Sequence, residues 1–548
     1  MRSSKALPSH GLVFDTVRSH RVGIAVWAAG GSLAMYAIAA GFASEVARFR
    51  GGARALAASM AAATEALRLL RWPAERLDTL GGYVTYHNVT LFVLFLSLYA
   101  GILGTRAVRG LENRRSLEVV LATGRSRAGV LGDRTAGSLL AVALISAGVG
   151  LGLAVSMAAG GAADTGGALI TAAAAGLCAL PAFALGLLLS QLMVSTRAAG
   201  GLTALVVTGL YVFTNVWEKT GPLRGARFLS PFFYFGRSRA LVPGYGFDLP
   251  AAAALVVMTA LLLGTAAWAF RRRDYAAPLW ARRARRPRAA GQVQRPLLRA
   301  YWTAALVRER YGLLAWAAAT AFAMGVMAWL EPGVVDLWDR LGLVRNWFGT
   351  QPGHAPAEQY LSFAAEIVAP VVAAFVITRA AAWVADLRQG RVELVLAAPV
   401  SWPRLVGERL AALLAGVLVI TAGSVTGLVI GAAAVGAPLS GPGLLRLAIV
   451  TVLLGAALGG VAALVVAWLR SGLAVTLLAV LVAASYLLTY LAQLFGWPGW
   501  TGRLSVFGAF GRPYLELPAA GGLVFLGALA VLGAGLAATV ASRSPKAA

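Results

Sequence analysis

The chain has 548 residues, of which 59% are hydrophobic and only 13% are charged, and its mean hydropathy is +0.75. Soluble chains carry about 25% charged residues, so this composition excludes a soluble globular protein and indicates one that folds in a lipid bilayer. The net charge of +26 does not indicate nucleic-acid binding, because no basic, aromatic-interleaved soluble segment accompanies it.

Long apolar runs recur along the whole chain. A helix needs about 20 apolar residues to cross the hydrocarbon core of a bilayer. Runs of this kind lie at 22–43, 88–105, 137–160, 168–193, 198–216, 249–270, 312–330, 362–383, 410–436, 443–469, 472–494 and 521–541. We therefore predict an all-α polytopic membrane protein with twelve spans.

The basic residues gather in alternate loops. The two termini and the loops after the even-numbered spans hold most of the arginines, which the positive-inside rule places in the cytoplasm. Lysine is nearly absent, a bias typical of GC-rich bacterial genomes. We expect a multi-pass protein of the bacterial inner membrane with both termini cytoplasmic.

Two stretches of the first half return 275 positions later. "SLEVVLATGRSRAGVLGDR" (116–134) matches "RVELVLAAPVSWPRLVGER" (391–409), and "LSPFFYFGR" (229–237) matches "LSVFGAFGR" (504–512). Two separate matches in one register predict a tandem duplication of six-helix halves, 1–274 and 275–548, with a basic cytoplasmic linker at about 271–310. Because each half has an even number of spans, the repeats are parallel.

The longer repeat lies between the second and third spans of each half. Leu117, Val120 and Leu121 have helical spacing, which predicts a short cytoplasmic helix that docks a two-fold partner. The alternative is an amphipathic loop stabilised by phospholipid, but a repeated glutamate gains nothing from an anionic leaflet. The candidate docking residues are Arg114, Arg115, Glu118, Arg125, Arg391, Glu393 and Arg404.

This repeat resembles the loop between spans 2 and 3 of type-2 permeases of ATP-binding-cassette (ABC) exporters. The double length resembles actinobacterial antibiotic exporters of the tetronasin-resistance type. The resemblance implies that the repeats are coupling helices inserted into a separately encoded ATPase, with Glu118 and Glu393 as contacts. It also implies two copies of that ATPase, with ATP and Mg²⁺ bound there and no cofactor on this chain.

The sequence itself contains no ATP-binding loop. That loop needs G-x-x-x-x-G-K-[ST], and none of Lys5, Lys219 and Lys546 follows a glycine. We thus expect a non-catalytic permease subunit. The alternatives are a proton-driven transporter of the major facilitator type, which is also a parallel 6+6 duplication, and a polytopic membrane enzyme. No disulfide or metal site is expected, because Cys178 is alone and the four histidines lack ligand spacing.

In the family, the substrate path lies between the halves and is lined by the second and fifth spans of each. The resemblance therefore implies a path for amphipathic small molecules such as antibiotics. The alternative for each lining residue is that it anchors its helix at the membrane interface. These residues are Phe95, Tyr99, Tyr211, Asn215, Tyr486, Thr489, Tyr490 and Gln493.

Three further features fall at the outer side of the predicted spans. Glu366 is a carboxylate within a span, which indicates either a cavity or an interfacial position. An external helix is expected over 54–77, with a shorter counterpart near 333–348. The shorter repeat is expected to form re-entrant pieces, either as an outer gate or as packing for the sixth span, through Phe232, Phe235, Phe507 and Phe510.

Overall fold

The computed structural model describes residues 11–47, 49–66, 71–113, 116–162, 164–193, 196–219, 221–274, 279, 300–340, 353–397, 400–494 and 500–543. These residues form helices and contain no strand. Within these described ranges, twelve helices are long and apolar enough to cross a membrane. The predicted all-α polytopic fold is therefore confirmed. Contacts within the chain divide it into two compact units, Met1–Arg288 and Ala289–Ala548, whereas the sequence predicts a boundary at 274/275.

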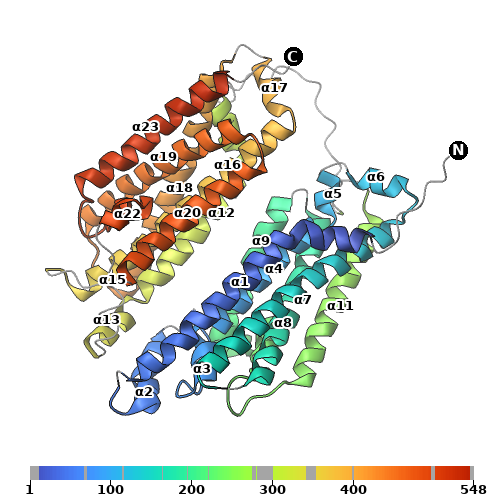
Figure 1. The fold of residues 1–548 in the computed structure, drawn as a ribbon, viewed down its shortest axis with the longest axis vertical. Coiled ribbons are helices and arrows are strands. Elements are labelled where there is room, and N and C mark those ends of the chain that lie inside the picture. The colour runs from blue at the N-terminus through green and yellow to red at the C-terminus, as the bar shows by residue number, and fades with distance from the viewer. Residues whose placement is uncertain are drawn as a thin grey trace. The chain divides into compact units, whose positions relative to one another are not determined.

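Unit 1 contains six spanning segments, joined by short helices (Figure 1). The spans are α1 (Gly11–Ala47), α3–η1–α4 (Leu80–Val84, Thr85–Val89 and Thr90–Arg106), α7 (Arg127–Ala159), α8 (Thr165–Leu192), α9 (Thr196–Val216) and α11 (Leu249–Arg272). The short elements are α2 (Gly52–Ala66), α5 (Arg109–Asn113), α6 (Ser116–Ala122), η2 (Trp217–Lys219), η3 (Gly221–Leu229) and α10 (Pro231–Phe235).

Unit 2 repeats this order. Its spans are α12 (Tyr301–Trp329), α15–α16 (Pro356–Glu366 and Val368–Arg388), α18 (Trp402–Val435), α19 (Gly441–Leu469), α20 (Gly472–Leu494) and α23 (Ala520–Arg543). Its short helices are α13 (Glu331–Arg340), α17 (Arg391–Leu396), α21 (Trp500–Arg503) and α22 (Val506–Phe510).

The two units share one packing pattern. The first span packs along the third, as α1 on α7 and α12 on α18, and the fourth packs on the second and sixth. Short helices lie at both ends of each bundle: α6 is at the opposite end of unit 1 from α2, and α17 is at the opposite end of unit 2 from α13 (Figure 1). The duplication seen in the sequence thus extends to helix packing.

Small residues bring the first and third spans close together. A Cβ added at Gly152 of α7 would lie 2.1 Å from Ser32 Oγ of α1, and one added at Gly427 of α18 would lie 2.1 Å from the Ala321 carbonyl oxygen of α12. These glycines are 275 positions apart. Helices in a membrane associate through such close backbone approaches, because lipid supplies no hydrophobic driving force between them.

Local sequence sets the helix ends. Ser126 caps α7 by accepting a 3.0 Å hydrogen bond from the Gly129 amide, and the aligned Ser401 precedes α18 with Pro403 in its first turn. The external helix predicted over 54–77 is shorter than expected, since α2 ends at Ala66 and the residues around Pro73 are not helical. Proline lacks an amide hydrogen and clashes with the preceding turn. The counterpart of α2 in unit 2 is α13.

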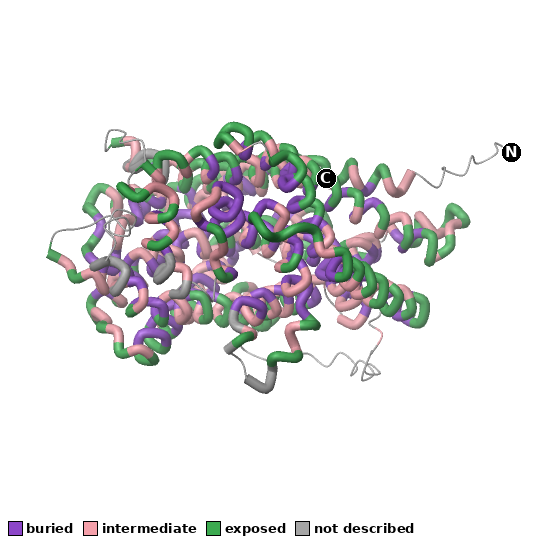
Figure 2. Tube along the Cα trace, turned by 90° about the horizontal axis from the view of Figure 1, so that it is seen from below, coloured by how far each residue is buried: buried purple, intermediate pink, exposed green. Residues whose placement is uncertain are grey.

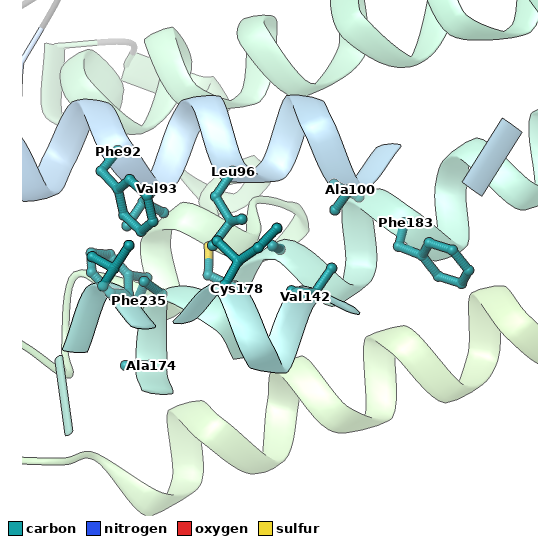
Figure 3. Packing of buried hydrophobic residues seen from close by; sticks show 14 of the residues in the cluster. Phe92, Val93, Leu96, Ala100, Val142, Ala174, Cys178, Phe183 and Phe235 are labelled. Carbon is teal, nitrogen blue, oxygen red and sulfur yellow. The ribbon is translucent and has the colours of Figure 1, made fainter. Parts of the chain in front are cut away.

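The core of unit 1 lies among α4, α7, α8 and α10. Leu96 of α4 and Cys178 of α8 point toward one another beside Val93 and Val142 (Figure 3), and each of the four is at most 1% exposed. Buried and exposed residues alternate along single helices (Figure 2), as expected of spans that present one face to neighbouring helices and another to lipid.

Candidate functional site

The repeated stretch forms a short helix in each unit, α6 and α17, and the two helices present the same face. Leu117 and Val392 are buried beneath them, while Glu118 and Glu393 are exposed. The next residues, Val119 and Leu394, are 68% and 77% exposed. Each helix therefore offers a carboxylate beside a bare aliphatic side chain.

These apolar side chains were not among the candidates drawn from the sequence. The helical spacing of the first copy indicated a buried stripe at Leu117, Val120 and Leu121, and all three contact the core. The exposure of Val119 lies outside that stripe. The recurrence of an apolar residue at the aligned position, Leu394, is the sequence signal that could have identified Val119 as part of the exposed face.

The basic candidates flank these helices in ion pairs. Arg125 Nη1 lies 2.6 Å from Asp133, and Arg404 Nε lies 3.0 Å from Glu408. Asp133 and Glu408 are aligned in the two repeats. The first pair joins the loop after α6 to the start of α7, whereas the second joins two turns of α18 itself.

The remaining basic candidates divide between described and undescribed residues. Arg391 at the start of α17 pairs with Asp386 at 3.2 Å. Arg114 and Arg115 lie outside the described residues. The coupling role of the basic candidates and of both glutamates stays a prediction.

A buried charge cluster anchors the approach to α6 in unit 1. Glu112 of α5 accepts a 2.9 Å hydrogen bond from Arg109 and another from Arg273, which follows α11. Arg109 also donates to the Met193 carbonyl oxygen at 2.6 Å, and Arg273 donates to Gln191 at 2.8 Å. The side chains of Arg109, Glu112 and Arg273 are at most 2% exposed. The cluster joins the helices beside α6 to the ends of α8 and α11.

Burial also acts on the pKa of one arginine in this cluster. Removal from water lowers the pKa of the Arg273 guanidinium, and the hydrogen bond from Arg273 to Glu112 opposes that shift. Sequence reasoning did not select Glu112, Arg109 or Arg273. Their contacts span up to 161 positions, so no local pattern reports them.

At the other end of each unit, hydrogen bonds join the fifth span to the serine that precedes the short helix α10 or α22, and we call this set of hydrogen bonds the latch. Thr214 donates to Ser230 at 2.6 Å, and Thr489 and Ser505 hydroxyls are also 2.6 Å apart. Ser230 donates to the Leu210 carbonyl oxygen, and Ser505 to that of Ser485. Each residue of the second set lies 275 positions after its counterpart, so the latch is duplicated with its chemistry intact.

An aromatic pair beside each latch is duplicated as well. Tyr211 meets Phe232 edge-on with ring centroids 5.2 Å apart, and Tyr486 meets Phe507 edge-on at 5.4 Å. Tyr211 and Phe232 are buried, whereas Tyr486 is 41% exposed. Two of the predicted path tyrosines thus contact predicted gate phenylalanines.

The other predicted path and gate residues lie in different surroundings. Phe95 is 51% exposed, and Tyr99 stacks on Trp27 of α1. Asn215 is buried and shares a side-chain hydrogen bond with Tyr211. Phe235 packs on Trp72, and Phe510 is buried. The side chains of Tyr490 and Gln493 lie outside the described residues. The assignment of these residues to a path or gate stays a prediction.

Glu366 forms an ion pair with the arginine of the shorter repeat. Its Oε1 lies 3.1 Å from Nε of Arg512, and both side chains are partly exposed. Arg237, the counterpart of Arg512, pairs instead with Asp248 at 2.6 Å. Each unit therefore neutralises this arginine, but with a carboxylate from a different helix.

The second span of each unit is irregular near its start. In unit 1 the span contains the π-helix η1 (Thr85–Val89), and His87 stacks on Tyr83 at 4.2 Å. In unit 2 the span breaks between α15 and α16 at Ile367. Such interruptions are frequent at functional sites. Among the residues that the structure describes, no three His, Cys, Asp or Glu side chains could hold a metal ion together.

Comparison with known families adds one match. Residues 298–540 are similar to the family described as "Multidrug efflux system permease Rv1217c, C-terminal domain". This match supports a role in multidrug efflux. It lies within unit 2 and leaves unit 1 uncovered. No curated protein matches the chain.

Proposed function

We propose that this chain is the membrane-spanning subunit of an ATP-driven exporter, a double-length type-2 ABC permease of the tetronasin-resistance type. The observation that carries the proposal is the repeated face of α6 and α17, where exposed Glu118 and Val119 recur as Glu393 and Leu394. A face presented once per unit fits a partner with two equivalent grooves. That partner is a pair of ATPase subunits, which bind ATP and Mg²⁺.

The chemistry of this face suits a protein partner better than lipid. The aliphatic side chain gains free energy when it leaves water, and the carboxylate gains a charge-assisted hydrogen bond to a basic groove. An anionic membrane surface would instead repel the glutamate. The positive-inside rule supports placing α6, α17 and both termini in the cytoplasm of a bacterial cell.

We further propose that the cargo is an amphipathic or hydrophobic small molecule, such as an antibiotic or drug. The similarity to a multidrug efflux permease supports this cargo class. In unit 2 Tyr486, which is 41% exposed beside Phe507, supports it as well, because an accessible aromatic ring binds apolar cargo while its hydroxyl makes polar contacts.

The docking assignment is tested by reversing both glutamates, Glu118→Arg with Glu393→Arg. The tagged full chain is purified from its native membrane, and co-purifying polypeptides with a G-x-x-x-x-G-K-[ST] loop are quantified. Each charge-assisted hydrogen bond contributes about 1.5–3 kcal/mol, so the double reversal is expected to weaken retention of the ATPase by more than about tenfold. Export should fall in parallel, while insertion into the membrane is unchanged.

The matched control reverses two exposed glutamates at the opposite ends of the units, Glu218→Arg with Glu516→Arg. This variant should retain the ATPase. Normal retention and export by the Glu118/Glu393 variant would contradict the docking role. A purified chain that transports in vesicles on a proton gradient alone would favour a major-facilitator-type carrier and refute ATP coupling.

A further inference from the structure

Unit 2 contains a cleft between its second, third, fourth and sixth spans, at the end where α17 lies. Its volume is about 390 Å³ when the open solvent at its mouth is counted. Trp383 and Leu387 of α16, Trp402 and Val406 of α18, and Arg409 and Arg470 line it, together with small apolar residues of α19 and α23. Tryptophan is typical of the boundary between hydrocarbon and headgroups, so the cleft opens at that level.

The charged residues lining this cleft are Arg409 and Arg470, both positive. The Arg409 side chain is 10% exposed, and its Nη2 lies 3.8 Å from Asp386, which lines a neighbouring pocket. In the described part of the chain, Nε of Arg409 has no hydrogen-bond partner. A buried guanidinium with an unmet donor calls for an acceptor.

Arg470 is held at the cleft by its backbone and by an aromatic ring. It ends α19 in the left-handed conformation, with φ of +46°. Its guanidinium lies 5.3 Å from the ring centroid of Trp402 and donates long hydrogen bonds, 3.3 and 3.4 Å, to the carbonyl oxygens of Ala467 and Ala541. Neutral carbonyls leave its charge uncompensated.

The internal carboxylate of unit 1 has no counterpart in unit 2. In the register of the duplication, Leu387 corresponds to Glu112 and Val466 to Gln191. Glu112 and Gln191 bind the buried arginines of unit 1. In unit 2 both positions are apolar and line the cleft, and Val384, which corresponds to Arg109, is apolar too, so this wall of the cleft carries no carboxylate.

We propose that this cleft binds an anionic phospholipid, with the phosphate between Arg409 and Arg470 and the upper part of one acyl chain along Trp383 and Val406. Arginine binds phosphate oxygens through paired, charge-assisted hydrogen bonds. Basic pockets between spans bind anionic headgroups where they open at the membrane surface. The lipid phosphate thus supplies the acceptor that Nε of Arg409 lacks and a negative charge beside Arg470. This site is independent of ATPase docking.

The test measures lipid retained by the purified full chain. The chain is incubated with mixed vesicles of phosphatidylglycerol and phosphatidylcholine, extracted in mild detergent, and examined by native mass spectrometry. Arg409→Gln with Arg470→Gln is expected to reduce retained phosphatidylglycerol at least about tenfold. Arg388→Gln, which removes an exposed arginine of α16 that does not line the cleft, should leave retention unchanged.

A second variant keeps both arginines. Leu387→Glu places a carboxylate at the position of Glu112, so it should lower phosphatidylglycerol retention by a similar factor in a chain that elutes as the parent does. Equal retention of phosphatidylcholine, or full phosphatidylglycerol retention by the Arg409/Arg470 variant, would overturn the proposal. Displacement of phosphatidylglycerol by millimolar inorganic phosphate would identify the ligand as a free anion and also overturn it.

The position of the retained lipid is measured by tryptophan fluorescence. Phosphatidylglycerol with brominated acyl chains should quench the parent more strongly than the Trp383→Phe/Trp402→Phe variant, because bromine quenches only indoles that it contacts. Equal quenching of the two proteins would place the retained lipid elsewhere and refute this site.

Discussion

Replacing Glu112 by glutamine removes the negative charge from the buried cluster of unit 1 while keeping the side-chain volume. Arg109 and Arg273 both donate to this carboxylate, and all three side chains are at most 2% exposed. After the change the two guanidiniums remain buried and have lost the carboxylate that both contact. Water cannot compensate them without opening the ends of α8 and α11, where Gln191 and Met193 hold the arginines.

The expected loss follows from this burial. Removing one partner of a buried ion pair costs about 3–5 kcal/mol, because the other charge stays desolvated. For a unit of this size the apparent melting temperature should fall by roughly 5–15 °C. The exposed pair Arg76–Asp78, with side chains 50% and 29% exposed, gives the contrast: Asp78→Asn should cost less than about 1 kcal/mol.

The chain contains a built-in reporter for this measurement. Cys178 is its single cysteine, and the residue is fully buried in unit 1. A thiol-reactive fluorophore therefore reports the unfolding of the unit that contains Glu112. The midpoint of labelling on heating is compared for the parent, Glu112→Gln and Asp78→Asn, all purified as full chains in the same detergent.

A second variant separates lost charge balance from a general packing defect. Glu112→Gln with Arg273→Met removes one of the two cations as well as the anion, so it should recover part of the lost stability. The reasoning is wrong if Glu112→Gln melts with the parent, or if the double variant loses the full sum of the two single effects.

Two further changes probe helix contacts and capping in unit 1. Gly152→Val should cost about 1–3 kcal/mol of stability through overpacking and so lower the midpoint of Cys178 labelling, since an added Cβ would lie 2.1 Å from Ser32 Oγ and 2.9 Å from its Cα. A Cβ added at Gly209 meets no atom within 4 Å, so Gly209→Val should change the midpoint little. Asp248 caps α11 through a 2.9 Å hydrogen bond from the Ala251 amide, and this bond, with Arg237, holds the pKa of its carboxyl below the ordinary range. Asp248→Ala should therefore cost about 1 kcal/mol at neutral pH. Because the folded-state pKa is depressed, the charge-dependent part of that difference is complete above the unfolded-state pKa and fades as the pH falls below about 4; a difference that grows on acidification would contradict the assignment.

The sequence by itself determined the spans, the duplication and the two repeated helices. Each of these depends on a property that the chain carries locally: apolar length, helical spacing, or identity at a fixed offset. The predicted runs coincide with the spanning helices, and some helices begin well before their run, as α1 and α12 do, because their polar first turns lie outside the apolar window. The repeat at 116–134 and 391–409 gives a short helix in each unit, as predicted.

Only the tertiary structure decided which polar side chains of these stretches are exposed and which are bonded to other parts of the chain. Glu112 and Glu118 are six positions apart in one arginine-rich loop, yet the first is buried between two arginines and the second is exposed. Thr489, predicted to line a path, has its hydroxyl on Ser505. The reason is physical: an ion pair or latch needs partners whose separation depends on how distant helices pack, and Arg273 approaches Glu112 across 161 positions. No periodicity within a loop records that approach.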